Sequence, residues 1–411
     1  MKKKGFDFMP YTLSEHIEKS FSRLSASEYQ IQNLFQPDTY DWPGDWEGRA
    51  LLAFCNLYEM TGKKIPAMDA FIEKLPLHLN AEGFMGQIFM ENAVDEQQLS
   101  GHGWLLCGLC EYYRLFQNES VLAMATRMVK NLFLRALPHY DHYPVQRAHA
   151  EDGAVSGNVV GVQCGWKVST DIGCAFICMD GLSRYYALTH DSAVFSFLEK
   201  TSALFMQIDK RAEKMQTHAT LTAARGIFRF YKETRDSKYF DFSKELFTLY
   251  LTHGMTDTYE NFNWFERKDT WTEPCAVTDS LILALWFYEE TGDACYRTLA
   301  RRIWFNGLSF CHRIHGGAGP NTCVTIDQPY LSISLFEAPF CCTMRYNEGL
   351  LTAQKNEALL CDADEAETVD EKGRHFIGDK MLVLDENGKQ VLLCDLAFGE
   401  NSSKKYLVMY E

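Results

Sequence analysis

The stretch Phe287-Tyr288-Glu289-Glu290-Thr291-Gly292-Asp293 ends one apolar segment of helical period and leads, through a short polar turn, into a second. The second segment, from Cys295 to Leu308, again repeats its apolar residues with the period of an amphipathic helix. A short turn between two such helices predicts an antiparallel helical hairpin.

The same arrangement recurs along the chain, and recurrence of one unit is the signature of a repeat architecture. The other copies are Leu57 to Gly62, Tyr112 to Asn118, Tyr185 to Asp191 and Phe230 to Asp236. A sixth hairpin is expected from the segment after Cys342, through Leu350 to Leu360. Stacked hairpins of this kind predict a mainly α toroid.

Long segments separate the predicted helices and supply material for a binding site, since long loops in compact domains are usually functional. They are Phe84 to Ser100, Pro138 to Lys167, Thr256 to Thr272 and Arg313 to Pro339. We expect them to gather at the mouth of the toroid.

The chain changes character at about Asp362. Lys380 to Leu384 and Gln390 to Cys394 have the composition of strands and flank Asn387-Gly388, which is typical of a tight β-hairpin turn. Residues 1–361 are therefore predicted to be the helical barrel domain, and residues 362–411 a small β-hairpin-containing segment.

Composition limits the kinds of partner. The 411 residues are 46% hydrophobic, which is enough for a large core, and 40 basic against 55 acidic residues give a net charge of −15. No basic run follows Lys2-Lys3-Lys4, which argues against nucleic acid and anionic membranes, and no apolar run has the length of a membrane span. We expect a small, uncharged partner, and the oligomeric state stays open.

The 14 cysteines are spread too thinly for a secreted disulfide scaffold. Many lie on apolar helical faces, where a reduced thiol acts as a small hydrophobic group. We therefore expect reduced cysteines and a cytoplasmic location.

Two short motifs carry candidate chemistry. Glu273 and Cys275 lie in Thr272-Glu273-Pro274-Cys275-Ala276, and Cys341-Cys342 form an adjacent pair later in the chain. One carboxylate and three thiols can bind Zn²⁺ in tetrahedral geometry. The alternative is two packed thiols and a carboxylate at a helix N-terminus, stabilised by the helix dipole.

With these motifs the chain resembles the cysteine-dependent, zinc-containing retaining β-L-arabinofuranosidases, in a shortened form. These glycoside hydrolases have an (α/α)6 barrel, and Gly101-His102-Gly103-Trp104 and the run from His218 to Asp236 also match the family. The resemblance covers roughly residues 40 to 360. It implies an (α/α)6 toroid, Zn²⁺ held by Glu273, Cys275, Cys341 and Cys342, and Cys341 as the nucleophile.

The family also implies a Glu general acid/base in a short motif that precedes the zinc-binding Glu. The nearest match is Tyr259-Glu260-Asn261-Phe262, which lies closer to Glu273 than the family spacing, and Glu266 is the second choice. We favour Glu260, because Glu266 adjoins a potential salt-bridge partner in Arg267.

The family contributes histidines to sugar hydroxyls at positions that match His102 and His218, while Trp104 and Trp264 could pack against a sugar ring. The alternatives are histidines that satisfy helix ends and tryptophans that belong to the core. His139, His142 and His149 form a looser cluster in a polar segment, where solvated histidines are the simpler interpretation.

The predicted function is a glycoside hydrolase, β-L-arabinofuranosidase-like, that acts on a small carbohydrate. One alternative is another sugar-processing enzyme on the same toroid, of the epimerase or unsaturated-uronide hydrolase type. The other is a non-catalytic, zinc-containing carbohydrate-binding protein.

Overall fold

The computed structural model describes residues 12–37, 39–89, 93–146, 156–361, 367–370, 375–377, 381–391 and 404–409. The chain divides into two compact units, which are described separately. The first unit consists of the described residues within Met1–Leu24, Glu59–Gly62 and Phe247–Glu411. The second unit consists of the described residues within Ser25–Tyr58 and Lys63–Leu246.

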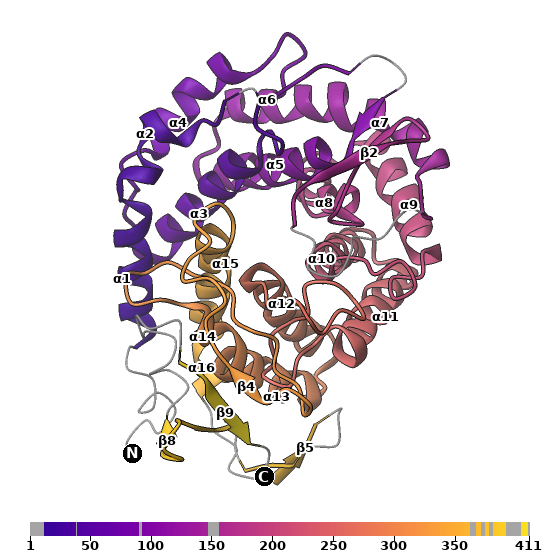
Figure 1. The fold of residues 1–411 in the computed structure, drawn as a ribbon. Helices are drawn as coiled ribbons and strands as arrows, with labels where there is room; N and C mark the ends of the chain where they lie inside the picture. Colours follow the sequence, from indigo (N-terminus) through magenta and orange to yellow (C-terminus); the bar gives the residue numbers. More distant parts are fainter. Residues whose placement is uncertain are drawn as a thin grey trace. The chain divides into compact units, whose positions relative to one another are not determined.

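The predicted helical pairs are present, including the sixth (Figure 1). Within the described residues they are α3 (Asp45–Thr61) and α4 (Met68–Lys74), α5 (Glu96–Phe116) and α6 (Glu119–Met128), α8 (Cys178–Thr189) and α9 (Ser192–Gln207), α10 (Thr217–Thr234) and α11 (Ser237–His253), α12 (Pro274–Thr291) and α13 (Ala294–Arg302), and α15 (Cys342–Lys355) and α16 (Glu357–Cys361).

The remaining helices are α1 (Leu13–Leu24), α2 (Ile31–Leu34), α7 (Leu134–Ala136) and α14 (Ser309–Cys311). Short 3-10 segments cover Ser27–Tyr29, Leu75–His78, Leu137–His142 and Cys174–Phe176, and π-helical segments cover Val129–Phe133 and Ile303–Leu308.

Several turns between paired helices share one geometry. A residue in the left-handed conformation ends the first helix, and the Asn or Asp that follows caps the second helix with its side chain. The pairs are Gln117 and Asn118, His190 and Asp191, Arg235 and Asp236, and Gly292 and Asp293. Each turn is therefore encoded locally by two neighbouring residues.

In the second unit, α8 packs against both α5 and α10. Glycines allow these close approaches, since a Cβ atom added at Gly103 would lie 2.7 Å from the Cα of Cys178, and one added at Gly226 would lie 2.6 Å from the carbonyl carbon of Met179. No larger side chain fits at either contact without moving a backbone.

A buried ion-pair network joins the same helices. The carboxylate of Asp180, on α8, is fully buried and lies 2.8 Å from Nε of Arg229, 3.3 Å from Nε of Arg184 and 3.5 Å from Nη2 of Arg225. A buried charge of this kind is tolerated because it is paired.

In the first unit, α12 packs against α13 and α15, and α1 packs against α15 (Figure 1). Most of α12 is buried, which fits its almost continuous apolar sequence. A buried ion pair between Asp279 of α12 and Arg345 of α15 fixes how the two helices lie along each other.

Three short strands from two segments that the sequence had suggested to be loops, Phe84 to Ser100 and Pro138 to Lys167, form one sheet. They are β1 (Val94–Asp95), β2 (Val159–Gln163) and β3 (Trp166–Ser169), in the order β1-β3-β2. Cys164 and Gly165 connect β2 and β3 with positive φ angles of 52° and 79°, as a two-residue hairpin requires. The loop prediction was therefore wrong for all three strands.

The predicted hairpin around Asn387-Gly388 is confirmed. β7 (Leu382–Leu384) and β8 (Gln390–Val391) are antiparallel, and Gly388 has a φ of 73°. β9 (Tyr406–Met409) lies between β7 and β4 (Tyr330–Leu331), while β5 (Glu367–Val369) pairs with β6 (His375–Ile377). The predicted domain boundary at residue 361 stays a prediction. Among the described residues, no helix is long and apolar enough to cross a membrane.

We expect Asp180→Asn to lower the free energy of unfolding by about 3 kcal/mol, because the substitution leaves buried guanidinium groups without their counter-charge. Urea denaturation at neutral pH measures the change. Asp236→Asn, at an exposed helix cap, is the matched control and should change stability little. Equal losses for the two variants would contradict a structural role for the Asp180 network.

Candidate functional site

Three cysteines meet at the N-terminal ends of two helices in the first unit. Cys275 is the second residue of α12, Cys342 is the first residue of α15, and Cys341 is the N-cap of α15. The Sγ atoms of Cys341 and Cys342 are 3.2 Å apart, those of Cys275 and Cys342 are 3.9 Å apart, and all three lie within 4.8 Å of one another. Pro274 at the first helical position favours the start of α12 at this point.

The spacing of these thiols fits a metal ion. Four ligands around zinc with Zn–S bonds of about 2.3 Å place neighbouring sulfur atoms roughly 3.8 Å apart. The Cys275 to Cys342 distance agrees with this value, and the Cys341 to Cys342 distance is shorter. A carboxylate oxygen of Glu273, the predicted fourth ligand, lies within 4.8 Å of the Cys275 Sγ atom. Among the described residues, the group of mutually close ligand atoms that the three thiols form does not include Glu273.

Two opposing electrostatic effects act on the thiols. Burial raises the pKa of Cys342 well above its ordinary value, and the neighbouring Cys275 and Cys341 raise that pKa further. The N-terminal ends of α12 and α15 carry partial positive charge, which stabilises thiolates. Cys341 is half-buried, whereas Cys275 and Cys342 are buried.

The chain before α15 is held by a compact polar network. The Glu337 carboxylate accepts hydrogen bonds from Nε of Arg23 at 2.9 Å and from the Thr343 hydroxyl at 2.8 Å. It also lies 2.6 Å from Nε2 of His315. Because Thr343 follows Cys342 directly, this network fixes the start of the helix that carries the two thiols.

Glu260 lies in an enclosed polar environment. Its Oε1 atom accepts hydrogen bonds from Nδ2 of Asn321 at 2.8 Å and from the Thr272 hydroxyl at 3.0 Å, with the Cys311 Sγ atom at 3.8 Å. Its Oε2 atom accepts one from the Thr258 hydroxyl at 3.1 Å. Burial outweighs these hydrogen bonds and raises the pKa of Glu260 to about 7.

Glu266 lies in a different environment. Its side chain is exposed, in a turn where its φ is 62°. The potential partner Arg267 lies 3.1 Å from Asp269 and also lies over the Trp264 ring, 5.0 Å from its centroid. Trp264 itself is buried and contacts Trp271 edge to face.

The other predicted sugar contacts belong to the second unit. Both ring nitrogens of His102 face backbone groups, at 2.8 Å from the Met85 nitrogen and 2.8 Å from the Gln98 oxygen. Trp104 is buried, with Arg49 over its ring and the His218 ring stacked at 5.9 Å. Sugar binding by His102, Trp104, His218 and Trp264 stays a prediction, and in this structure all four side chains are buried.

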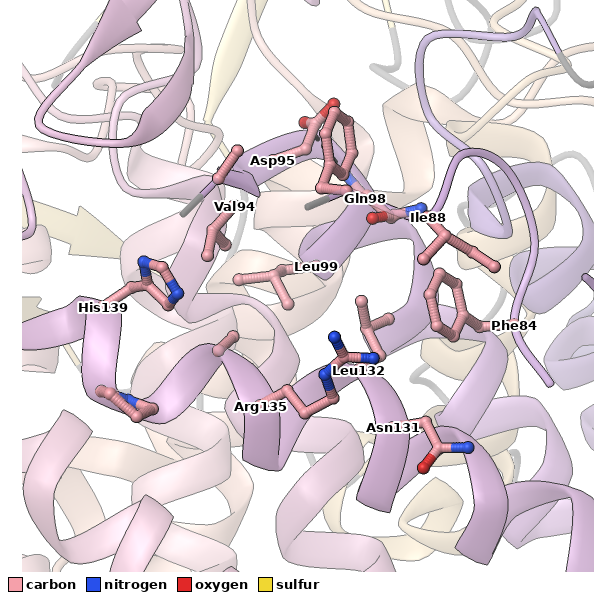
Figure 2. Close-up of a pocket in the computed structure, with 14 residues that line it drawn as sticks. Phe84, Ile88, Val94, Asp95, Gln98, Leu99, Asn131, Leu132, Arg135 and His139 are labelled. Carbon is pink, nitrogen blue, oxygen red and sulfur yellow. Dashed lines mark hydrogen bonds between the residues drawn. The ribbon is translucent and has the colours of Figure 1, made fainter. Parts of the chain in front are cut away.

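A pocket in the second unit was not predicted from the sequence (Figure 2). It has a volume of about 310 Å³ and an apolar floor that includes Leu99 and Leu132, with Arg135 and His139 among its polar walls. It contains none of the predicted site residues. His139 belongs to the histidine cluster noted in the sequence; His149 lies outside the described residues.

Sequence reasoning missed the groups that surround Glu260. Thr258 and Thr272 lie near it in the chain, but Asn321, Cys311 and Arg313 come from distant segments. Asn321 lies within Arg313 to Pro339, which we expected to contribute to the mouth, and no local pattern marks it.

Comparison with known proteins gives the fold. No protein-family model matches this sequence, and no curated protein is significantly similar to it. A sugar epimerase from a ruminal bacterium matches with a TM-score of 0.57 and 13% identity, over 84% of this chain and 97% of its own. An unsaturated glucuronyl hydrolase specific for heparin matches with a TM-score of 0.56 and 13% identity, over 84% and 98%.

A GH127 β-arabinofuranosidase also matches, with a TM-score of 0.53 and 13% identity, over 91% of this chain. This chain spans 63% of the length of that protein. The matches confirm the predicted class, a mainly α fold of the (α/α)6 toroid type, and the resemblance to the arabinofuranosidases holds at the level of the fold.

The environment of Glu260 predicts a pH effect on stability. Its raised pKa means that the folded state binds one proton more than the unfolded state between about pH 4.5 and pH 7. Protonated Glu260 stabilises the folded state fully below that window, and this stabilisation is lost as the pH rises through it. The free energy of unfolding of Glu260→Gln, relative to that of the wild type, should therefore rise by about 3 kcal/mol between pH 4.5 and pH 7.5.

Urea denaturation at the two pH values measures this gain. Glu266→Gln, which removes an exposed carboxylate, is the matched control. If the stability difference between Glu260→Gln and the wild type stayed constant with pH, the enclosed environment of Glu260 would be wrong.

Proposed function

We propose that this chain is a retaining glycoside hydrolase that cleaves a β-L-arabinofuranoside-type linkage in a small carbohydrate, with Cys341 as the nucleophile. The observation that carries the proposal is the meeting of three thiols at the N-terminal ends of α12 and α15. A structural core does not require three cysteine sulfurs within 4.8 Å of one another, whereas a metal site that includes a thiolate nucleophile does.

The proposed metal ligands are Glu273, Cys275, Cys341 and Cys342. Bound Zn²⁺ would keep the thiols ionised at neutral pH, which a buried thiol otherwise resists. The two helix N-termini would add to this effect, because their partial positive charge also favours thiolates.

Cys341 is assigned as the nucleophile because it is the half-buried thiol of the three. A nucleophile has to reach the anomeric carbon, whereas the buried Cys275 and Cys342 are suited to hold a metal. The position of Cys341 at the N-cap also places its sulfur at the end of the helix.

Glu260 is assigned as the general acid/base, because a carboxyl group with a pKa of about 7 can both donate and accept a proton at neutral pH. In the first step, the Cys341 sulfur bonds to the anomeric carbon while Glu260 protonates the departing sugar oxygen. In the second, the Glu260 carboxylate takes a proton from water, whose oxygen displaces the Cys341 sulfur. Two displacements at one carbon retain its configuration.

A second candidate is a sugar epimerase or an unsaturated-uronide hydrolase. The epimerase and glucuronyl hydrolase structures have TM-scores of 0.57 and 0.56, and the match extends over nearly their whole length. Neither reaction would need the three-thiol cluster, so metal content separates these functions from the proposed one.

Protein purified under reducing conditions should contain about one zinc ion per chain by elemental analysis. Cys342→Ser should lose most of it, because a hydroxyl is a poor replacement for a thiolate ligand. Cys164→Ser, at an exposed thiol of the second unit, is the control and should keep its zinc. A wild-type protein that holds no zinc would overturn the thiolate mechanism and favour the second candidate.

The catalytic roles are tested on a β-L-arabinofuranosyl disaccharide. Glu260→Gln should lower kcat by about 100- to 10,000-fold, as expected for loss of a general acid. The loss should be smaller on a p-nitrophenyl glycoside, whose leaving group needs no proton, and Cys341→Ser should be inactive on both.

Glu266→Gln is the matched control for this experiment and should stay active. If Glu266→Gln lost activity and Glu260→Gln kept it, the acid/base assignment would be wrong. A zinc-containing wild type without activity on a panel of furanosides and pyranosides would favour a carbohydrate-binding role.

A further inference from the structure

Arg313 is a fully buried cation whose hydrogen bonds all go to oxygen atoms among the described residues. Its Nε donates to the Phe336 carbonyl at 2.8 Å, and its Nη1 donates to the carbonyl of Phe310. Its Nη2 lies 2.8 Å from the Gly319 carbonyl and 2.9 Å from the Oδ1 atom of Asn321. No carboxylate contacts Arg313 directly among the described residues, and Glu260 and Cys311 interact with it electrostatically.

Asn321 joins this cation to Glu260. A guanidinium group can only donate hydrogen bonds, so the amide of Asn321 must turn its oxygen toward Arg313. Its NH₂ group then necessarily points to Glu260, where Nδ2 lies 2.8 Å from Oε1. The Asn321 backbone is also held, because its nitrogen donates to the Thr272 hydroxyl and its oxygen accepts from the Thr272 nitrogen, both at 2.9 Å.

The two oxygens of Glu260 are therefore unequal. Oε1 faces the Asn321 amide, the Thr272 hydroxyl and the Cys311 thiol, and an amide N–H can only donate. Oε2 faces the hydroxyl of Thr258, which can either donate or accept and lies 3.0 Å from the hydroxyl of Thr256. A proton on Oε1 would face the Asn321 amide N–H, which can only donate, whereas a proton on Oε2 faces a hydroxyl that can accept it.

We propose that Asn321, oriented by Arg313, is a positioning residue that fixes Oε1 of Glu260 as an acceptor and so makes Oε2 the oxygen that carries the exchangeable proton. This inference rests on the proposed function in so far as Glu260 is the acid/base. The observation behind the inference is the arrangement of hydrogen-bond donors around the Glu260 carboxyl group.

The same guanidinium group also supports the approach to Cys341. Arg313 donates to the carbonyls of Leu335 and Phe336, and the chain continues from there through Glu337 to Cys341. One buried cation thus holds both the amide that orients Glu260 and the segment that leads to the proposed nucleophile.

Among the residues that the structure describes, the titratable groups that face the Glu260 carboxyl group are Arg313, Cys311 and Cys323. Burial raises the pKa of both thiols, so they stay neutral at the pH where Glu260 titrates. Arg313 is then the charge that acts on Glu260, through Asn321.

The test is a titration of the Glu260 carboxyl group by ¹³C NMR, in the full chain labelled at the side-chain carboxyls of glutamate. Glu260→Gln assigns the resonance. Asn321→Ala and the isosteric Asn321→Asp should both raise the midpoint by about one pH unit or more, because each removes a donor that stabilises the ionised form. Asn321→Asp preserves the volume of the side chain, so it provides the measurement if Asn321→Ala does not fold.

Thr258→Val is the matched control, with loss of a single partner on the other oxygen. It should shift the midpoint clearly less, because the Thr258 hydroxyl serves both protonation states. Gln328→Ala, at an exposed position of the same segment, should leave the midpoint unchanged. An unchanged midpoint in both Asn321 variants, or an equal shift in Thr258→Val, would overturn the inference.

This titration needs no substrate, so it is independent of the proposed function. If the Glu260 midpoint shifted in the Asn321 variants but the wild type had no glycosidase activity, the role of Asn321 would stand and the proposed function would be rejected. In an active protein, the alkaline limb of the kcat/KM profile should move with the NMR midpoint, while the KM value stays within about twofold. If the Asn321 variants were active and the alkaline limb of their kcat/KM profile lay at the wild-type pH, the role of Asn321 would be rejected and the proposed function would stand.

Discussion

The packing of α12 against α15 is the contact on which the candidate site depends. It brings Cys275 and Cys342, which are 67 positions apart in the chain, to within 3.9 Å of each other. The buried pair of Asp279 and Arg345 lies one helical turn beyond Cys275 and Cys341, so a slip of either helix along the other would separate two buried charges. Such a separation is costly in a low-dielectric interior, and the ion pair therefore keeps the thiols in register.

Glu260 and Glu266 show how the surroundings of a carboxylate decide what it can do. They lie six positions apart in one segment, yet Glu260 is enclosed by threonine, asparagine and cysteine side chains, and Glu266 is exposed. Burial in this enclosure raises the pKa of Glu260 to about 7. A proton donor at neutral pH requires this kind of enclosure, which distant residues supply.

Much of the fold could be read from the sequence because its turns are local. Gly292-Asp293 combines a residue suited to the left-handed conformation with a residue that caps the next helix, and both act within a few positions. The thiol motifs were readable for a similar reason, since they begin helices. The hairpin at Cys164-Gly165 was missed although its glycine was a usable signal.

The surroundings of Glu260 could not be read in this way. Asn321 lies 61 positions from Glu260, and its amide is oriented by Arg313, whose own partners are backbone carbonyls. Backbone carbonyls are present at every residue, so a sequence carries no mark of which ones will surround a buried cation. The pairing of β4 with β9 was missed because it too joins distant segments.

The discontinuity of the first unit bears on how the protein is made. Its helix α1 is synthesised before its partner α15, which begins at Cys342. The hairpins between them can form as they are synthesised, because their contacts are local. The apolar face of α1, with Leu13, Ile17 and Leu24, cannot be covered by its partner until α15 has been synthesised. Until then these side chains lack the partner that covers them in the folded unit, and apolar surface exposed in this way promotes aggregation.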